Sequence, residues 1–329
     1  MRTVARELDI AFLGCGRAAA THARLLGSLD KKVRLHFASR DPTRSQAARK
    51  RHGGAGAFPS YEAALADDAV DVVFVTTPPT LHLELTLAAL EAGKDVIVEK
   101  PAFPAPQDFG KVRSAMERHR RRVLVAENYY YKPLRRRLED ILARGLVGEP
   151  LFLHVNAVKR QSPEGWRAAR EVTGGGGLLE GGIHWINLVS NLGLEVVDVS
   201  GYRAGGRTGE HRGGDDVAES ILAVLSLEGG AVANLAFSWE VPSPLQGVRM
   251  SRIYGREGSV LFESNGLFVC VWGKRARFYL PGFRDLAGYR AMLTDFLHAL
   301  RTAEEPDMTL AMAERDVETV HRIYRSLES

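Results

Sequence analysis

Cysteine is scarce in this chain, and that scarcity limits the kinds of site it can build. Among 329 residues there are two cysteines, Cys15 and Cys270, which lie far apart and have no Cys or His beside them at metal-ligand spacing. A disulfide framework and a cysteine-based zinc site are therefore not expected. We expect two free thiols in a reducing compartment.

Long apolar runs are also lacking. No segment approaches the ~20 consecutive apolar residues that a membrane-spanning helix needs. Near its start the chain has only the short apolar run Ile10–Leu13, which leads into glycines rather than into a cleavage-like site. We therefore expect no signal peptide, no membrane partner and a cytoplasmic protein.

A strong excess of one charge is missing as well, since 44 basic residues stand against 40 acidic ones. Basic clusters occur at Arg118–Arg122 and Arg135–Arg137, but no aromatic-rich nucleic-acid-binding module accompanies them. Solvated helix ends explain such clusters more simply. Nucleic acid is therefore not an expected partner.

What the chain does have is the size and balance of a two-domain globular protein. Hydrophobic residues make up 45% and charged residues 26%, a profile typical of soluble folded proteins. A chain of 329 residues is longer than the chains that usually fold around a single hydrophobic core. We expect one domain at 1–126 and a second at 127–329, with packing of the C-terminal helices back on the first domain as an option.

The first part alternates short β-rich runs with helical patterns, which is typical of βαβ units around a parallel sheet. The predicted strands are Asp9–Leu13, Val33–Ala38, Asp71–Thr76, Asp95–Val98 and Val123–Ala126. The predicted helices are Ala18–Leu29, Pro42–Arg51, Tyr61–Ala66, Leu81–Ala92 and Gln107–Arg120. This order predicts an α/β fold built on a parallel sheet.

The second part reads as successive strands with few helices between them, which predicts a large, mainly antiparallel sheet. The predicted strands are Leu151–Val158, Val196–Arg203, Ser220–Leu227, Ala231–Trp239, Arg249–Tyr254, Ser259–Phe262 and Gly266–Trp272. The predicted helices are Leu178–Leu192, Leu286–Thr302 and Leu310–Leu327. The segment Gly205–Asp216 is rich in turn residues, and we expect a loop there.

A glycine pattern marks the expected cofactor site. Gly14, Gly16, Arg17 and Ala18 follow the first predicted strand and open a helix, so the motif has the G-x-G-x-x-G/A context. Glycines let backbone N–H groups approach a pyrophosphate, and the helix N-terminus favours its charge. An ordinary tight turn is the alternative interpretation of the pattern alone.

The end of the second predicted strand favours NADP over NAD. Ser39 and Arg40 stand where NAD enzymes place an acid on the ribose 2′-hydroxyl, and Arg44 adds a second positive charge one turn later. Asp41 leaves two options open. It is either the N-cap of the helix that begins at Pro42 or a slightly displaced NAD-type acid.

Two further strand ends carry residues suited to cofactor and substrate. Thr77 and Pro78 follow the third predicted strand, with His82 in the next turn. Glu99 and Lys100 close the fourth, and a lysine at that edge is a candidate to hydrogen-bond the oxygen whose carbon exchanges hydride. A surface ion pair of Glu99 with Lys100 and a capping or surface His82 are the simpler alternatives.

A polar stripe marks the expected acid–base residues. Glu180, His184, Asn187 and Asn191 recur at intervals of four, three and four in the helix predicted from Leu178. A histidine held by a carboxylate can accept an alcohol proton while hydride leaves the same carbon. A buried hydrogen-bond network or a partner contact is the alternative, and without a third ligand we expect no metal.

Taken together, these motifs resemble the glucose-fructose oxidoreductase, inositol dehydrogenase and MocA (Gfo/Idh/MocA) family over essentially the whole chain. The motifs, in the family's order, are the Gly14 turn, Thr77-Pro78, Glu99-Lys100-Pro101, Asn128-Tyr129, Gly165-Trp166-Arg167 and Gly175 to His184. The resemblance implies an N-terminal Rossmann dinucleotide-binding domain and a C-terminal α/β domain for substrate binding, whose open sheet often mediates homodimers or homotetramers.

The resemblance also implies roles for individual residues. The family's catalytic lysine, carboxylate and histidine fall on Lys100, Glu180 and His184. Residues implied to bind substrate are Asn128, Tyr129, Trp166, Arg167 and Asn187. Two family positions that usually hold Asp are Glu180 and Asn187 here, and Tyr130 stands where arginine is common.

The expected activity is hydride transfer between NADP, or NAD, and a carbinol or carbonyl carbon of a sugar, cyclitol or related small polyol. Two alternatives stay open. One is a non-catalytic regulator that senses NAD(P) or sugar. The other is a redox-neutral NAD-dependent glycosidase.

Overall fold

The computed structural model describes residues 7–204, 217, 219–243, 245, 247–302 and 304–327. By its contacts the chain divides into two compact units, residues 1–127 with 289–314 and residues 128–288 with 315–329. The predicted loop Gly205–Asp216 lies outside the described residues. The domain boundary at 126/127 stays a prediction.

The first unit is built on a parallel sheet with the strand order β3-β2-β1-β4-β5-β6. The strands are β1 (Leu8–Leu13), β2 (Val33–Ala38), β3 (Gly56–Phe58), β4 (Val72–Val75), β5 (Asp95–Glu99) and β6 (Val123–Ala126). Every residue of β1 and β4 is buried, as expected for a parallel sheet covered on both faces. The predicted Rossmann architecture is confirmed.

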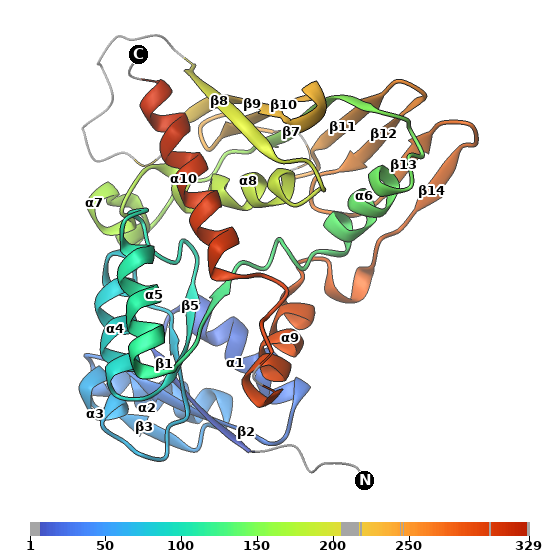
Figure 1. The fold of residues 1–329 in the computed structure, drawn as a ribbon. Helices are drawn as coiled ribbons and strands as arrows, with labels where there is room; N and C mark the ends of the chain where they lie inside the picture. The colour runs from blue at the N-terminus through green and yellow to red at the C-terminus, as the bar shows by residue number, and fades with distance from the viewer. Residues whose placement is uncertain are drawn as a thin grey trace. The chain divides into compact units, whose positions relative to one another are not determined.

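Helices cover both faces of this sheet. They are α1 (Arg17–Leu29), α2 (Pro42–His52), α3 (Tyr61–Leu65), α4 (His82–Glu91), α5 (Asp108–His119) and α9 (Tyr289–Thr302). In Figure 1, α4 and α5 lie side by side, and α9 packs along α1. Right-handed crossovers place α1 and α2 on one face and α4 and α5 on the other. The carboxyl ends of all six strands therefore meet at one edge, where ligands of such sheets bind.

The second unit contains an eight-stranded sheet with the order β14-β13-β12-β11-β7-β10-β9-β8, in which only β7 and β10 pair in parallel. Its strands are β7 (Pro150–Val158), β8 (Val196–Arg203), β9 (Ser220–Leu227), β10 (Val232–Ser238), β11 (Met250–Gly255), β12 (Gly258–Glu263), β13 (Val269–Trp272) and β14 (Arg277–Tyr279). The predicted mainly antiparallel sheet is confirmed.

The helices of this unit are α6 (Pro133–Ala143), α7 (Arg170–Thr173) and α8 (Ile183–Ser190), and α10 (Leu310–Ser326) joins it from its sixth residue on. They lie along one face of the sheet in Figure 1. Phe237 of β10 approaches Gly182, just before α8, and Gly201 of β8 contacts the backbone of α10 at Ile323. The other face of the sheet carries no helix among the described residues.

The helix predicted over Leu178–Leu192 needs correction. Residues Leu178–Gly182 form one turn of π-helix, and the α-helix proper runs from Ile183 to Ser190. Single π-turns are wider than α-helix and are frequent at functional sites. Glu180 therefore lies on a π-turn and His184 on the α-helix that continues it.

Several other elements differ from expectation. The short strands β3 and β14 and the helix α6 are absent from the prediction, and the helix expected from Leu286 begins at Tyr289. The strand predicted from Gly266 begins at Val269, because Gly266 has a φ of 103° and lies in a turn.

Candidate active site

The turn after β1 leaves room for the phosphates of a dinucleotide. Gly14 has a φ of 107°, and a Cβ there would lie 3.0 Å from the carbonyl oxygen of Thr76, so only glycine fits without strain. Apart from Gly16 and its two chain neighbours, no described residue has an atom within 4 Å of the place that a Cβ on Gly16 would take. α1 then begins at Arg17 and Ala18 without a side-chain cap. An uncapped helix N-terminus reached over glycines suits a pyrophosphate.

Asp41 caps the helix that follows β2. Its Oδ1 accepts hydrogen bonds from the backbone N–H of Thr43 at 2.9 Å and from the Thr43 hydroxyl at 2.6 Å. Ser39 is buried, and its Oγ accepts from the backbone N–H of Asp41 at 3.2 Å. The N-cap interpretation of Asp41 is thus confirmed, and this carboxylate is turned toward α2.

Positive charge gathers at the same corner. Burial raises the pKa of the Tyr61 phenol, and the nearby guanidinium groups of Arg40 and Arg44 act against that rise. Burial likewise raises the pKa of the Cys15 thiol, again opposed by Arg44. Cys15, Arg40, Arg44 and Tyr61 are therefore neighbours at the carboxyl ends of β1 and β2.

A cavity of about 460 Å³ opens beside the glycine turn, between α1 and α2. Its lining includes Gly16, Phe37 and the guanidinium-bearing residues Arg17, Arg44 and Arg51. Among the described residues that line it none is acidic. The cavity therefore combines an apolar floor with three cations.

His82 lies inside the first unit, not on its surface. Its ring is 1% exposed, with Nε2 lying 2.9 Å from the Thr77 carbonyl and Nδ1 3.0 Å from the Pro101 carbonyl. Burial lowers the pKa of His82, although these carbonyls oppose the shift. The ring thus links the turn at Thr77 and Pro78 to the segment after Lys100, and the surface alternative for His82 is wrong.

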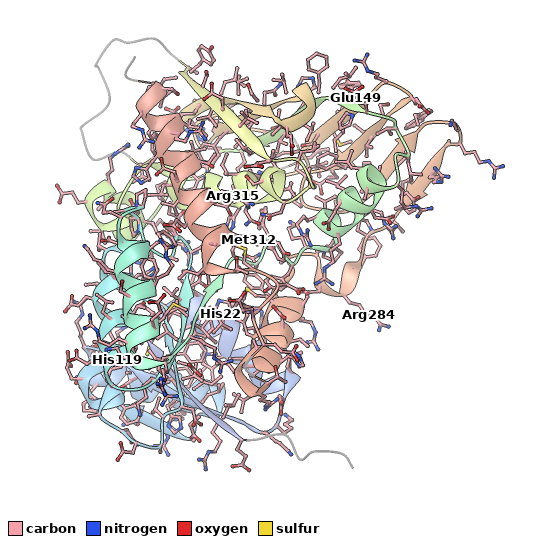
Figure 2. The ribbon with its side chains drawn as sticks, in the orientation of Figure 1. His22, His119, Glu149, Arg284, Met312 and Arg315 are labelled. Atoms are coloured by element: carbon pink, nitrogen blue, oxygen red, sulfur yellow. The ribbon has the colours of Figure 1, made fainter. Side chains whose placement is uncertain are left out.

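Glu99 is turned inward, toward a histidine of α1. The His22 Nε2 lies 2.6 Å from Glu99 Oε1, and Glu99 Oε2 accepts a hydrogen bond from the backbone N–H of Lys100 at 3.1 Å. Burial alone would raise the pKa of Glu99, but His22 and Lys100 hold it below its usual value. His22 is labelled in Figure 2. The contact between His22 and Glu99 is therefore buried, and it directly adjoins the backbone of Lys100.

In the second unit, Glu180 and His184 each have a defined neighbour. The Arg167 Nε lies 3.3 Å from Oε1 of Glu180. The His184 ring stacks on Tyr129 with 4.3 Å between ring centroids, and the Lys132 ammonium lies 4.2 Å from the centre of the same Tyr129 ring. The structure therefore brings a carboxylate, an imidazole and two cations to the start of α8.

The remaining residues assigned to substrate divide into two groups. Trp166 is 38% exposed and packs against the Arg167 guanidinium. Asn128 and Asn187 are buried, and their amide groups donate to the Ala287 carbonyl and to Asp316, both at 2.6 Å. Trp166 and Arg167 are thus accessible to a ligand, whereas Asn128 and Asn187 hold parts of their own unit together.

Sequence reasoning missed His22, Arg51, Tyr61 and Lys132. One signal was available for His22, which shares the buried face of α1 with Ala19, Ala23 and Leu26. A histidine on an apolar helix face needs a buried partner. No comparable signal points to the other three.

Two absences concern only the part of the chain that the structure describes. No helix there is both long and apolar enough to cross a membrane. Nor do three or more His, Cys, Asp or Glu side chains gather there in a group that could hold a metal ion.

The chain matches two family models. Residues 8–127 match an oxidoreductase family with an NAD-binding Rossmann fold, and residues 135–261 match the GFO/IDH/MocA C-terminal domain. Together the two matches span well over half of the chain.

Curated relatives and solved structures agree with this. The chain is 28% identical over 298 residues to D-xylose 1-dehydrogenase (NADP(+)) 2 of Haloferax volcanii, covering 89% of each chain. It is 29% identical over 135 residues to D-xylose 1-dehydrogenase [NADP(+)] of Haloarcula marismortui, covering 40% of this chain and 38% of that one.

Among solved structures, levoglucosan dehydrogenase in complex with NADH and levoglucosan superposes with a TM-score of 0.84 at 19% identity, covering 98% of this chain and 97% of that chain. At that identity the likeness concerns the fold. With both family models matched in order along the sequence, the chain belongs to the Gfo/Idh/MocA family of NAD(P)-dependent oxidoreductases.

Proposed function

We propose that the protein is an NADP-preferring dehydrogenase or reductase that acts on a carbinol or carbonyl carbon of a sugar, cyclitol or related small polyol. The observation that carries this proposal is the setting of Lys100, at the carboxyl end of β5 and directly after a carboxylate engaged by His22. A lysine that only forms a surface ion pair would not need the buried His22–Glu99 contact next to its backbone. The relatives named as xylose and levoglucosan dehydrogenases support the substrate class.

The residues around the glycine turn fit a dinucleotide. Gly14 and Gly16 leave space at the start of α1, where backbone N–H groups would hold the pyrophosphate. Arg40 and Arg44 would hold a 2′-phosphate, since guanidinium groups match phosphate geometry. Asp41 does not compete for this role because its carboxylate caps α2. A bound nicotinamide would supply or accept the hydride.

The chain's own groups would handle the oxygen and its proton. In our proposal the Lys100 ammonium donates a hydrogen bond to the reacting oxygen. The His184 imidazole accepts the hydroxyl proton during oxidation and returns it during reduction. Stacking on Tyr129 limits the rotation of the His184 ring, and Arg167 balances the charge of Glu180.

Lys100→Met tests the chemical part of the proposal. We expect turnover to fall by about 10²–10³, the usual loss when one hydrogen-bond donor to a reacting oxygen is removed. Affinity for NADPH should stay within about twofold, because the residues proposed to hold the nucleotide are untouched. Steady-state kinetics over a panel of sugars and polyols, with NADPH fluorescence for binding, gives both values. The exposed Lys111→Met on α5 is the matched control. Turnover retained in Lys100→Met would remove the lysine from the mechanism.

Arg44→Ala tests the cofactor part. We expect the Kd for NADPH to rise about tenfold, because one charge-assisted contact to phosphate is lost, and the Kd for NADH to stay the same. Lys50→Ala, an exposed cation on the same helix, should change neither constant. An equal loss of affinity for both cofactors in Arg44→Ala would show that this arginine does not recognise the 2′-phosphate.

A further inference from the structure

The π-turn that carries Glu180 begins without a local cap. Helix starts expose backbone N–H groups that a Ser, Thr, Asp or Asn side chain normally satisfies. Here the preceding residues are the four glycines Gly174–Gly177, which have no side chain to offer. Glycine also leaves the unfolded chain the most freedom, so holding this segment in one conformation costs more than usual. Some other part of the chain has to fix it.

Two side chains from distant positions supply acceptors at this start. Glu219, just before β9, accepts a hydrogen bond at Oε1 from the backbone N–H of Leu178 at 2.7 Å. Tyr324, in α10, accepts at its hydroxyl oxygen from the backbone N–H of Leu179 at 3.3 Å, and this N–H also donates to the Gly176 carbonyl at 3.1 Å. The Tyr324 hydroxyl in turn donates to Glu219 Oε1 at 2.6 Å. One carboxylate and one phenol thus cap consecutive N–H groups of the turn.

The glycines make this approach possible. A Cβ on Gly176 would lie 2.5 Å from Glu219 Oε1 and 2.6 Å from the Tyr324 hydroxyl oxygen. A Cβ on Gly177 would lie 2.8 Å from the carbonyl oxygen of Val217, which accepts the Gly177 N–H. Any side chain at 176 would therefore push the two caps away. Because Glu219 and Tyr324 pack this closely against the backbone, the segment before the π-turn has to be glycine at this position.

Both caps lie among charged side chains. The Glu219 side chain is 2% exposed, and its Oε2 lies 3.5 Å from Arg203 and 3.9 Å from Arg170. These cations balance the buried carboxylate, while Oε1 is left to the turn. Burial and the adjacent carboxylate raise the pKa of Tyr324 well above its ordinary value of 10.0, so the phenol keeps the proton that it donates to Glu219.

We infer that Glu219 and Tyr324 are positioning residues for Glu180 and His184, acting as a remote cap that fixes the π-turn from which α8 starts. They touch the backbone of the turn, and their effect on chemistry passes through it. This inference rests on the proposed function, in which Glu180 and His184 serve the reaction.

Tyr324→Phe is the sharpest test, because it removes one hydroxyl and leaves the ring. We expect amide hydrogen exchange over 178–182 to speed up at least tenfold and kcat to fall about tenfold, with a smaller change in KM. NADPH affinity should be unchanged. Glu219→Met, which keeps the length of the side chain but removes both acceptor oxygens, should show the same pattern. Ser114→Ala, which removes a hydroxyl from an exposed side chain of α5, is the control and should match the wild type.

Each outcome is decisive. Exchange over 178–182 no faster than in the wild type, in both variants, would overturn the cap. Faster exchange with unchanged kcat would overturn the positioning role. Exchange needs no substrate, so it remains informative if Lys100→Met keeps its turnover and the proposed function itself fails.

Discussion

At the scale of single residues, the site depends on histidines that do not touch the expected reactants. His22 contacts Glu99 inside the first unit, and His82 joins the carbonyls of Thr77 and Pro101. Both rings are buried, and each contacts one residue of the Glu99-Lys100-Pro101 segment. Removing one partner of such a buried contact leaves the other without compensation, which costs far more than the contact itself contributes.

The Glu99 pair gives a stability prediction. We expect His22→Ala to lower the free energy of unfolding by about 3 kcal/mol, since it leaves a largely buried carboxylate without its imidazole and opens a cavity. Urea unfolding followed by circular dichroism measures this. Lys111→Ala, which breaks the exposed pair with Asp108, should cost well under about 1 kcal/mol. Equal losses in the two variants would show that the His22 contact is no stronger than a surface pair.

His82 gives a pH prediction. Its pKa in the folded chain lies below the ordinary 6.5, so between that lowered value and 6.5 the unfolded chain binds a proton that the folded chain does not. The free energy of unfolding should therefore fall as pH drops below 6.5. We expect His82→Gln to flatten this slope, measured by urea unfolding at several pH values from 6.5 down to about 5. His298→Gln, at an exposed site, serves as the control. If the dependence of the unfolding free energy on pH is unchanged in His82→Gln, then His82 is not its cause.

At the scale of elements, local chemistry sets most boundaries. The strands β2, β6, β8 and β9 run as predicted, because their apolar residues alternate or cluster clearly between turn residues. The helix α6 was missed since its arginine run Arg135–Arg137 reads as solvated surface. Arg135 is in fact buried, with its guanidinium over Tyr130 and paired to Glu139.

The parts of the site that escaped prediction share one cause. His22 and Glu99 are 77 residues apart in the sequence, and Glu219 and Tyr324 are 105 residues apart. Nothing in the spacing of either pair marks a contact, because only the folded chain brings them together. The π-turn likewise has no sequence period, since glycines carry no apolar pattern. Motifs contiguous in sequence, such as Gly14 to Ala18, were recognisable.

The cap of α2 gives a prediction at this scale. Asp41→Ala removes the two hydrogen bonds that Thr43 donates, and we expect the melting temperature to fall by a few degrees. The ratio of NADPH to NADH affinity should stay the same, because the carboxylate faces the helix. Differential scanning calorimetry and fluorescence titration give the two values. A shift of the ratio toward NADPH would mean that Asp41 acts on the ribose after all.

At the scale of the whole molecule, one face of the eight-stranded sheet carries several large exposed apolar side chains, next to polar ones such as Arg252 and His154. Its registers put exposed side chains from five strands on one face, namely Phe152, Tyr202, Leu222, Trp272 and Phe278. Apolar patches of this kind mark association surfaces in soluble proteins. We propose that copies of the chain associate through this face as a homodimer or homotetramer.

This proposal predicts the behaviour of one variant. We expect sedimentation velocity to show an oligomer for the wild type and a shift to monomer for Trp272→Glu, because a charge would be buried without a partner in the interface. Lys274→Glu, in the turn after β13, should leave the oligomer intact. A monomeric wild type at micromolar concentration would contradict the association.

The most direct test of the proposed function is a side-by-side fluorescence titration of the purified protein with NADPH and NADH, since it requires no knowledge of the substrate. Tighter binding of NADPH is the predicted result, because Arg40 and Arg44 gather at the end of β2 while Asp41 caps α2. Tighter binding of NADH would contradict the cofactor assignment, and binding of neither would contradict a catalytic role for the nucleotide site.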